Sequence, residues 1–146
     1  MPLVLASAQE TAQFGAALAP RLQRGDIIGL SGALGTGKTT FARGLIGALG
    51  FLGEVVSPSF GLAIPYDGPE MSLPVLHIDL YRLANGHDIG TLGIDDMLEV
   101  GAVLVEWPEH FSRGWPNMLR LTLKTMNEGA RRLTADVPPS WEGRWI

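Results

Sequence analysis

Length, composition and charge describe a small folded protein and exclude several classes of function. The chain has 146 residues, about one domain, and 46% hydrophobic and 18% charged residues are a balance typical of a globular core. It has no cysteine, which excludes disulfides, thiolate metal sites and cysteine nucleophiles. No apolar run approaches the roughly 18 residues that span a bilayer, and the first residues lack the basic segment of a signal peptide. We therefore expect one cytoplasmic domain, residues 1–146, with no membrane partner.

The charge is unevenly distributed along the chain. A net charge of −4 argues against a nucleic acid bound over a broad surface, because such binding depends on neutralising phosphates. Residues 1–109 hold five cations and twelve carboxylates, whereas residues 110–146 hold six cations and three carboxylates. The basic segment could face an acidic surface or an RNA, although a solvated face of terminal strands is the more ordinary interpretation. Its cations are Arg113, Arg120, Lys124, Arg131, Arg132 and Arg144.

The spacing of apolar residues predicts an alternation of strands and helices. Residues 3–6 predict a short strand, and Ser7 followed by Glu10 is a capping-box pattern for a helix running toward Arg24, which Pro20 must kink or interrupt. Further strands are predicted at residues 27–31, 62–66, 74–79, 102–106, 118–124 and 132–137, and further helices at residues 41–49 and 95–99. The last two strands look like an antiparallel hairpin. The order of elements predicts an α/β fold with a mainly parallel sheet, helices on both faces and antiparallel strands at the C-terminal end.

A glycine-rich segment lies between the second predicted strand and the helix that follows it. Gly32, Gly37, Lys38 and Thr39 satisfy the pattern G-x-x-x-x-G-K-[ST], of which about 0.003 chance matches are expected from this composition. Glycines let the backbone curl so that N–H groups point at phosphate oxygens, and the helix adds its positive N-terminal end. The pattern predicts a P-loop NTPase fold. The expected nucleotide contacts are Leu34, Gly35, Thr36, Gly37, Lys38, Thr39 and Thr40.

The loop residues also indicate the ligand. Lys38 is predicted to reach the β- and γ-phosphates, and Thr39 to place its hydroxyl on Mg²⁺. The chain has nine arginines and only two lysines, yet this position carries lysine, whose compact ammonium fits inside a curled loop. The Asn-Lys-x-Asp element of common GTPases is absent, since Lys124 is followed by Thr125 and Met126. ATP is therefore the expected nucleotide, by elimination.

Two carboxylates follow apolar runs of strand type. Asp79 and Glu106 each stand at the end of a predicted strand, and ligands gather at the C-terminal strand ends of an open α/β sheet. P-loop enzymes need a carboxylate that holds Mg²⁺ and a group that orients the attacking water. We place Asp79 near the metal and the γ-phosphate and Glu106 as the second carboxylate, but spacing alone leaves the two roles exchangeable.

Other polar residues have weaker signals. The Ser-Pro-Ser-Phe segment at residues 57–60 lies where P-loop proteins can carry a switch segment that responds to the γ-phosphate. A hydroxyl there, such as that of Ser59, could bind Mg²⁺ or phosphate. The alternative is a plain Ser-Pro turn. Arg82 and Arg43 are possible charge-stabilising groups, although Arg43 is better explained as a surface residue. Three ring side chains could be core or edge residues, and the core is the preferred interpretation for them: His77, Tyr81 and Trp107.

Five segments spread along the chain resemble the TsaE family, formerly YjeE. They are Leu-Gly-Thr-Gly-Lys-Thr-Thr-Phe at residues 34–41, Ser-Pro-Ser-Phe at 57–60, His-Ile-Asp-Leu-Tyr-Arg at 77–82, Leu-Gly-Ile at 92–94 and Val-Glu-Trp-Pro at 105–108. The third and fifth segments together are specific. The family's usual Ser-Pro-Thr-Phe has serine for threonine here, which keeps the hydroxyl, and Ala33 replaces a common acid in the loop.

The resemblance implies an accessory ATPase of tRNA threonylcarbamoyladenosine synthesis. In the family, the positions matching Lys38, Thr39, Asp79, Glu106 and Trp107 are linked to nucleotide, Mg²⁺ and activity. The implied partner is a TsaB–TsaD complex, reset by ATP turnover, with tRNA contacted only through that complex. Two alternatives stay open: a stand-alone small-molecule kinase, which would need room for an arginine-rich lid, and a nucleotide-sensing module that never turns over, against which the paired carboxylates count.

Overall fold

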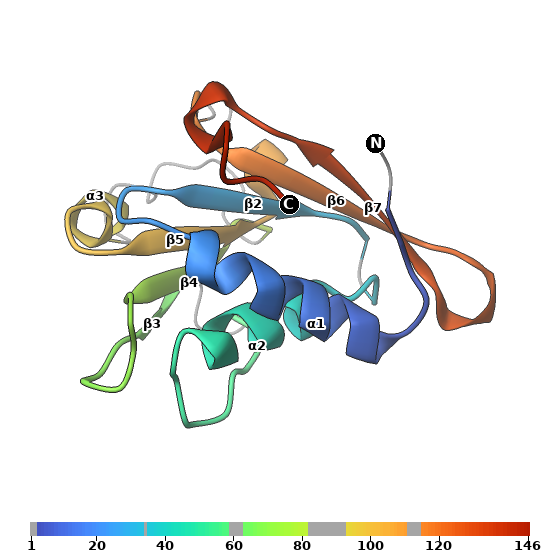
Figure 1. The fold of residues 1–146 in the computed structure, drawn as a ribbon, viewed down its shortest axis with the longest axis horizontal. Coiled ribbons are helices and arrows are strands. Elements are labelled where there is room, and N and C mark those ends of the chain that lie inside the picture. The colour runs from blue at the N-terminus through green and yellow to red at the C-terminus, as the bar shows by residue number, and fades with distance from the viewer. Residues whose placement is uncertain (1–2, 34, 59–62, 82–92, 111–114) are drawn as a thin grey trace.

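A seven-stranded sheet forms the centre of the molecule (Figure 1). The computed structural model describes residues 3–33, 35–58, 63–81, 93–110 and 115–146. The strands are β1 (Leu3–Leu5), β2 (Ile27–Ser31), β3 (Ala63–Tyr66), β4 (Val75–Asp79), β5 (Ala102–Glu106), β6 (Leu119–Thr125) and β7 (Arg131–Asp136), in the spatial order β1-β7-β6-β2-β5-β4-β3. The α-helices are α1 (Ala8–Leu18), α2 (Lys38–Ala48) and α3 (Ile94–Leu98). Short 3₁₀ turns cover Ala19–Arg21, Pro108–His110, Asn127–Gly129 and Pro139–Trp141.

The sheet is parallel at its centre and antiparallel at both edges. Strands β6, β2, β5 and β4 run parallel, and the hairpin of β6 and β7 confirms the antiparallel pairing expected at the C-terminal end. The sequence did not predict that β3 pairs antiparallel with β4. The connection at residues 67–74 is too short for a parallel crossover, which needs about a dozen residues or more. Pro65 lies on β3, where the edge position tolerates its missing N–H.

Alternating side chains of the central strands divide the core into two layers. On one face, Ile28 and Leu104 belong to the cluster that α1 and α2 cover, and these two helices lie side by side in Figure 1. On the other face, Val103 and Val105 pack in a cluster with Ile94 of α3. The expectation of helices on both faces is confirmed.

The cap of α1 follows the predicted pattern, but the helix is shorter than predicted. The Ser7 hydroxyl accepts a hydrogen bond from the backbone N–H of Glu10 at 3.2 Å, as in a capping box. The helix ends at Leu18 instead of running toward Arg24. Pro20, which lacks a backbone N–H and lies at the start of the following 3₁₀ turn, explains this end.

Close packing against α1 fixes the position of α2. A Cβ atom on Gly44 would clash with the backbone carbonyl of Ala12, so only glycine permits this approach of the two helices. Because α2 begins at Lys38, directly after the glycine-rich loop, this packing also places the loop at the end of β2.

Two further findings bear on the expectations from the sequence. None of the helices that the structure describes is long and apolar enough to cross a membrane. Three residues that the sequence singles out, Leu34, Ser59 and Arg82, lie outside the described residues. Their predicted roles stay predictions.

Candidate functional site

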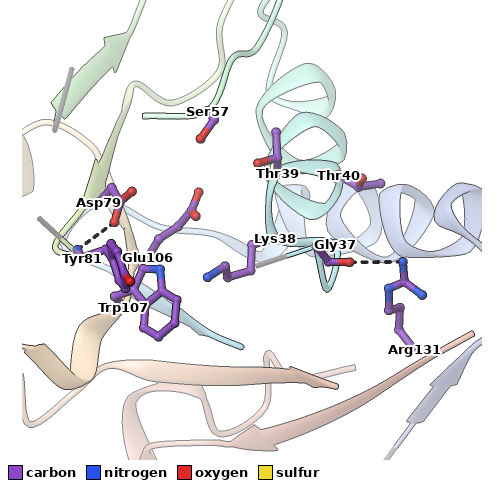
Figure 2. Close-up of a pocket in the computed structure, with 11 residues that line it drawn as sticks. Gly37, Lys38, Thr39, Thr40, Ser57, Asp79, Tyr81, Glu106, Trp107 and Arg131 are labelled. Carbon is purple, nitrogen blue, oxygen red and sulfur yellow. Dashed lines mark hydrogen bonds between the residues drawn. The ribbon is translucent and has the colours of Figure 1, made fainter. Parts of the chain in front are cut away.

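A cavity of about 300 Å³ opens beside the loop that follows β2 and the C-terminal ends of β4 and β5 (Figure 2). Most of the predicted site residues that the structure describes meet here. The lining consists of Gly35, Gly37, Lys38, Thr39, Thr40, Ser57, Asp79, Tyr81, Glu106, Trp107 and Arg131. Thr36 is the exception among the predicted contacts: it is buried, and its hydroxyl donates to the backbone carbonyl of Ala33 at 2.8 Å.

The glycines shape the loop in the way that phosphate binding requires. Gly32 has a φ of 147°, and a Cβ atom there would lie 2.6 Å from the carbonyl oxygen of Leu123. Gly37 precedes α2 with a φ of 106°, a left-handed conformation that a side chain would strain. The curled backbone therefore leads straight into the positive N-terminal end of α2, at the wall of the cavity.

Lys38 presents a buried cation to the cavity. Its side chain is 5% exposed, its Nζ donates to the carbonyl oxygen of Gly32 at 2.6 Å, and the same atom lies 4.0 Å from the centroid of the Trp107 ring. Burial lowers the pKa of the Lys38 ammonium from its ordinary value of 10.5, against the opposite effect of nearby carboxylates, chiefly Glu106 and Asp79. No carboxylate among the described residues lies within 4.0 Å of Nζ, so the amine has anions nearby without a direct ion pair.

The two predicted carboxylates stand next to each other. Asp79 and Glu106 are register partners at the ends of β4 and β5, and each is 4% exposed. One oxygen of each is held: Asp79 Oδ1 accepts from the backbone N–H of Tyr81 at 2.8 Å, and Glu106 Oε2 is 2.7 Å from His77 Nε2. Within the described chain, no hydrogen bond occupies the second oxygen of either group. Both carboxylates can therefore offer one oxygen to a ligand.

Trp107 closes one side of the cavity through an unusual backbone conformation. Its φ is 60°, in the left-handed region that bulky residues rarely adopt. Its backbone N–H donates to the Leu30 carbonyl at 3.1 Å, and its ring lies 4.9 Å from the Tyr81 ring, centroid to centroid. The turn out of β5 thereby brings an aromatic face over Lys38.

Comparisons with known proteins identify the family. The family model described as "Threonylcarbamoyl adenosine biosynthesis protein TsaE" matches residues 5–133. The chain belongs to the TsaE family. A tRNA threonylcarbamoyladenosine biosynthesis protein TsaE of Treponema pallidum is 35% identical over 92% of this chain and 98% of its own length. The protein of the same name from Streptomyces coelicolor is 43% identical over 66% of this chain and 66% of its own length.

A solved structure extends the comparison to the fold. The crystal structure of Bacillus subtilis YdiB superposes with a TM-score of 0.80 at 27% identity, covering 98% of this chain and 89% of that one. The predicted P-loop NTPase fold is therefore confirmed, and the TsaE resemblance with it.

The structure of this TsaE-family protein confirms one interpretation made from the sequence and corrects two. His77 is fully buried, as expected of a core residue, and its ring is also bonded to Glu106. Tyr81, expected in the core, is 50% exposed and lines the cavity. Arg131 belongs to the basic segment for which a solvated face was the preferred interpretation, yet its side chain reaches the glycine-rich loop. The signal for the first two was their place in the segment His-Ile-Asp-Leu-Tyr-Arg, whereas nothing near Arg131 in the sequence indicates its contact.

Two other residues lie where the sequence analysis suggested. Arg43 is exposed on α2 and donates from Nε to the Val55 carbonyl at 3.3 Å, which fits the surface role preferred for it. Ser57 lines the cavity beside the loop. The place of Ser57 at the cavity agrees with a switch segment at residues 57–60, of which the structure describes residues 57 and 58.

The oxygen atoms at the cavity suit one particular kind of cation. The described residues contain no group of three or more His, Asp or Glu side chains that could enclose a metal by themselves. The available donors are the hydroxyl of Thr39 and the carboxylates of Asp79 and Glu106. Mg²⁺ is commonly held by one or two carboxylates together with substrate phosphates, so these residues fit Mg²⁺ delivered with a nucleotide better than a resident metal.

Proposed function

We propose that this protein binds Mg·ATP in the cavity and hydrolyses it slowly, with turnover that rises on a TsaB–TsaD complex in tRNA threonylcarbamoyladenosine biosynthesis. The observation that carries the proposal is the buried Lys38 ammonium, which lies beside a glycine-shaped loop and near two carboxylates without an ion pair to either. A buried cation without a counter-ion is costly, and a bound polyphosphate would compensate it.

The roles of the residues follow from their positions. The N–H groups of the loop and the Lys38 ammonium would bind the β- and γ-phosphates, while Thr39, Asp79 and Glu106 would hold Mg²⁺ directly or through water. Bound Mg²⁺ would neutralise part of the negative charge on the phosphate oxygens. A carboxylate accepts a hydrogen bond from a water, whose oxygen forms a bond to the γ-phosphorus as the bond to the β-phosphate oxygen breaks, giving ADP and inorganic phosphate. One hydrogen bond fixes each carboxylate, from His77 for Glu106 and from the backbone N–H of Tyr81 for Asp79. We assign the water to Glu106 and the metal to Asp79, a division that separate substitution of the two residues tests.

The relatives support the biological context of the proposal. Their names connect them with threonylcarbamoyladenosine biosynthesis on tRNA. The acidic balance of residues 1–109 suits a protein-facing role better than independent tRNA binding, so tRNA would be reached through the TsaB–TsaD complex. Hydrolysis would then reset the complex between rounds of modification.

The test is phosphate release from Mg·ATP by the purified protein, alone and with the TsaB–TsaD pair. Lys38→Ala should abolish both basal and stimulated release, because the triphosphate loses its buried cation. Lys124→Ala, which removes the exposed lysine of β6, is the matched control and should behave as the wild type.

Three other results would contradict the proposal. Equal activity of Lys38→Ala and the wild type would move the nucleotide out of this cavity. Tight Mg·ATP binding without phosphate release, in the presence of partners shown to be active, would favour the nucleotide-sensing module. Transfer of phosphate to an added metabolite without any partner would favour the kinase.

A further inference from the structure

Arg131, the first residue of β7, lines one end of the cavity and is bonded to backbone carbonyls of the phosphate loop. Its Nε donates to the carbonyl oxygen of Thr36 at 2.9 Å, and one terminal nitrogen donates to the carbonyl oxygen of Gly35 at 3.4 Å. The other terminal nitrogen donates to the carbonyls of Gly129 at 2.9 Å and Ala130 at 3.2 Å, in the turn before β7. One guanidinium therefore joins the loop to the β6–β7 hairpin.

These contacts are made to carbonyl oxygens of the loop, whereas phosphate is bound by N–H groups. In a planar trans peptide the C=O and N–H groups point in opposite directions, so the hydrogen bond from Arg131 to the Thr36 carbonyl fixes the N–H of Gly37 in the direction opposite to Arg131. Gly37 lines the cavity. A cation on the carbonyl also polarises the peptide group, which strengthens its N–H as a donor toward phosphate.

The charge of Arg131 is not cancelled by an acid within the described residues. All four of its hydrogen bonds there go to backbone carbonyls, and no described carboxylate forms an ion pair with it. Figure 2 shows its side chain at the end of the cavity opposite Asp79 and Glu106, with Lys38 between. The loop end of the cavity thus has a positive charge in addition to that of Lys38.

We propose that Arg131 is a positioning residue that preorganises the phosphate loop for the polyphosphate of a nucleoside di- or triphosphate. The inference rests on the function proposed above. Because Arg131 acts through loop peptides and not on the terminal phosphate, its loss weakens ADP and ATP alike. Because the loop is shaped before the reaction, the loss raises KM and leaves kcat nearly unchanged.

The experiment compares three variants by calorimetric titration with ADP and with Mg·ATP, and by steady-state phosphate release. Arg131→Met, which keeps a long unbranched side chain, should weaken both ligands about tenfold, the order expected for lost hydrogen bonds to a charged group. Arg131→Lys keeps the charge without the planar fork and should recover only part of the affinity. Arg132→Met is the control: it is exposed on the neighbouring position of β7 and should bind as the wild type.

The outcomes separate this inference from the proposed function. If the wild type binds and Arg131→Met binds within twofold of it, Arg131 does not position the loop. A loss for ATP but not ADP would instead indicate a contact with the γ-phosphate, and a fall in kcat at constant KM a role in the transition state; either overturns the inference. If Arg131→Met does not fold, full affinity in Arg131→Lys overturns it equally. A wild type that binds neither nucleotide contradicts the proposed function itself.

Discussion

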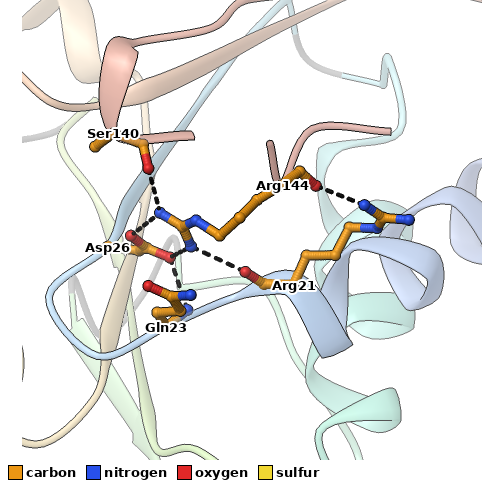
Figure 3. A network of polar contacts seen from close by, with 5 residues as sticks. All are labelled: Arg21, Gln23, Asp26, Ser140 and Arg144. Atoms are coloured by element: carbon orange, nitrogen blue, oxygen red, sulfur yellow. Dashed lines mark hydrogen bonds and ion pairs between the residues drawn. The ribbon is translucent and has the colours of Figure 1, made fainter. Parts of the chain in front are cut away.

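The two ends of strand β2 hold buried charges in opposite ways. Before the strand, Asp26 forms a two-pronged ion pair with Arg144, at 2.7 Å and 3.0 Å (Figure 3). Both partners make further hydrogen bonds. Asp26 Oδ2 accepts from the backbone N–H of Gln23 at 2.7 Å, and Arg144 donates to the carbonyls of Arg21 and Ser140. Beyond the strand, Lys38 lies near Asp79 and Glu106 but is bonded to neither within the described chain.

The difference indicates that one end is built for stability and that the other is suited to receive a ligand. A bidentate pair with satisfied hydrogen bonds needs nothing further, and it ties the C-terminal segment to the start of the central strand. Charges that are buried close together without direct contact leave room for an ion or ligand to complete them. We therefore expect substitutions before β2 to change stability alone and substitutions after it to change activity.

After the loss of activity expected for Lys38→Ala, the largest effect is expected from the carboxylates. Glu106→Gln should lower phosphate release about 10²- to 10⁴-fold, the usual contribution of a positioned acid–base group, with little change in ATP affinity. Asp79→Asn should instead raise the Mg²⁺ concentration needed for half-maximal activity. The measurement is phosphate release across a Mg²⁺ titration for each variant, and identical behaviour of the two would refute this division of roles.

The opposite end should give a smaller effect of another kind. Arg144→Met leaves Asp26 without its partner, so the free energy of unfolding should fall by about 2–3 kcal/mol, somewhat less than for a fully buried pair. ATP affinity should not change. Urea unfolding and nucleotide titration test both statements, with Arg24→Met, an exposed arginine close by in sequence, as control. A loss of affinity without a loss of stability would break the comparison.

The smallest effect expected is that of the unligated Lys38 charge on the stability of the ligand-free protein. Burial lowers the pKa of Lys38 in the folded protein, so the unfolded chain keeps the Lys38 proton to higher pH. Below the folded-state pKa, the buried charge therefore lowers the free energy of unfolding by its full amount. Lys38→Met should therefore stabilise the ligand-free protein at neutral pH. This gain should shrink as the pH rises from the lowered pKa toward 10.5, where the wild type loses the charge.

Thermal unfolding at several pH values measures that gain, with Lys124→Met as the matched lysine control. A destabilised Lys38→Met at neutral pH would show that the nearby carboxylates outweigh the burial of Lys38 after all. In that case the charges beyond β2 would resemble the Asp26 pair more closely than the present contacts indicate.

Local features of the site were predictable because they depend on neighbours in the chain. The glycine-rich loop and the capping of α1 by Ser7 each involve residues within a few positions of one another, and hydrophobic spacing located most strands to within one or two residues. Asp79 and Glu106 were identified as candidates because strand ends are recognisable in the sequence. The roles of Leu34 and Ser59 stay predictions.

The sequence by itself determined the elements, the phosphate loop and the family, since these are written in contiguous residues. Only the tertiary structure decided that His77 contacts Glu106, that Asp79 lies in register beside it, and that Arg131 reaches the loop. Such contacts join residues far apart in the chain. They depend on strand order and register, which the packing of the whole sheet fixes and which no local pattern specifies.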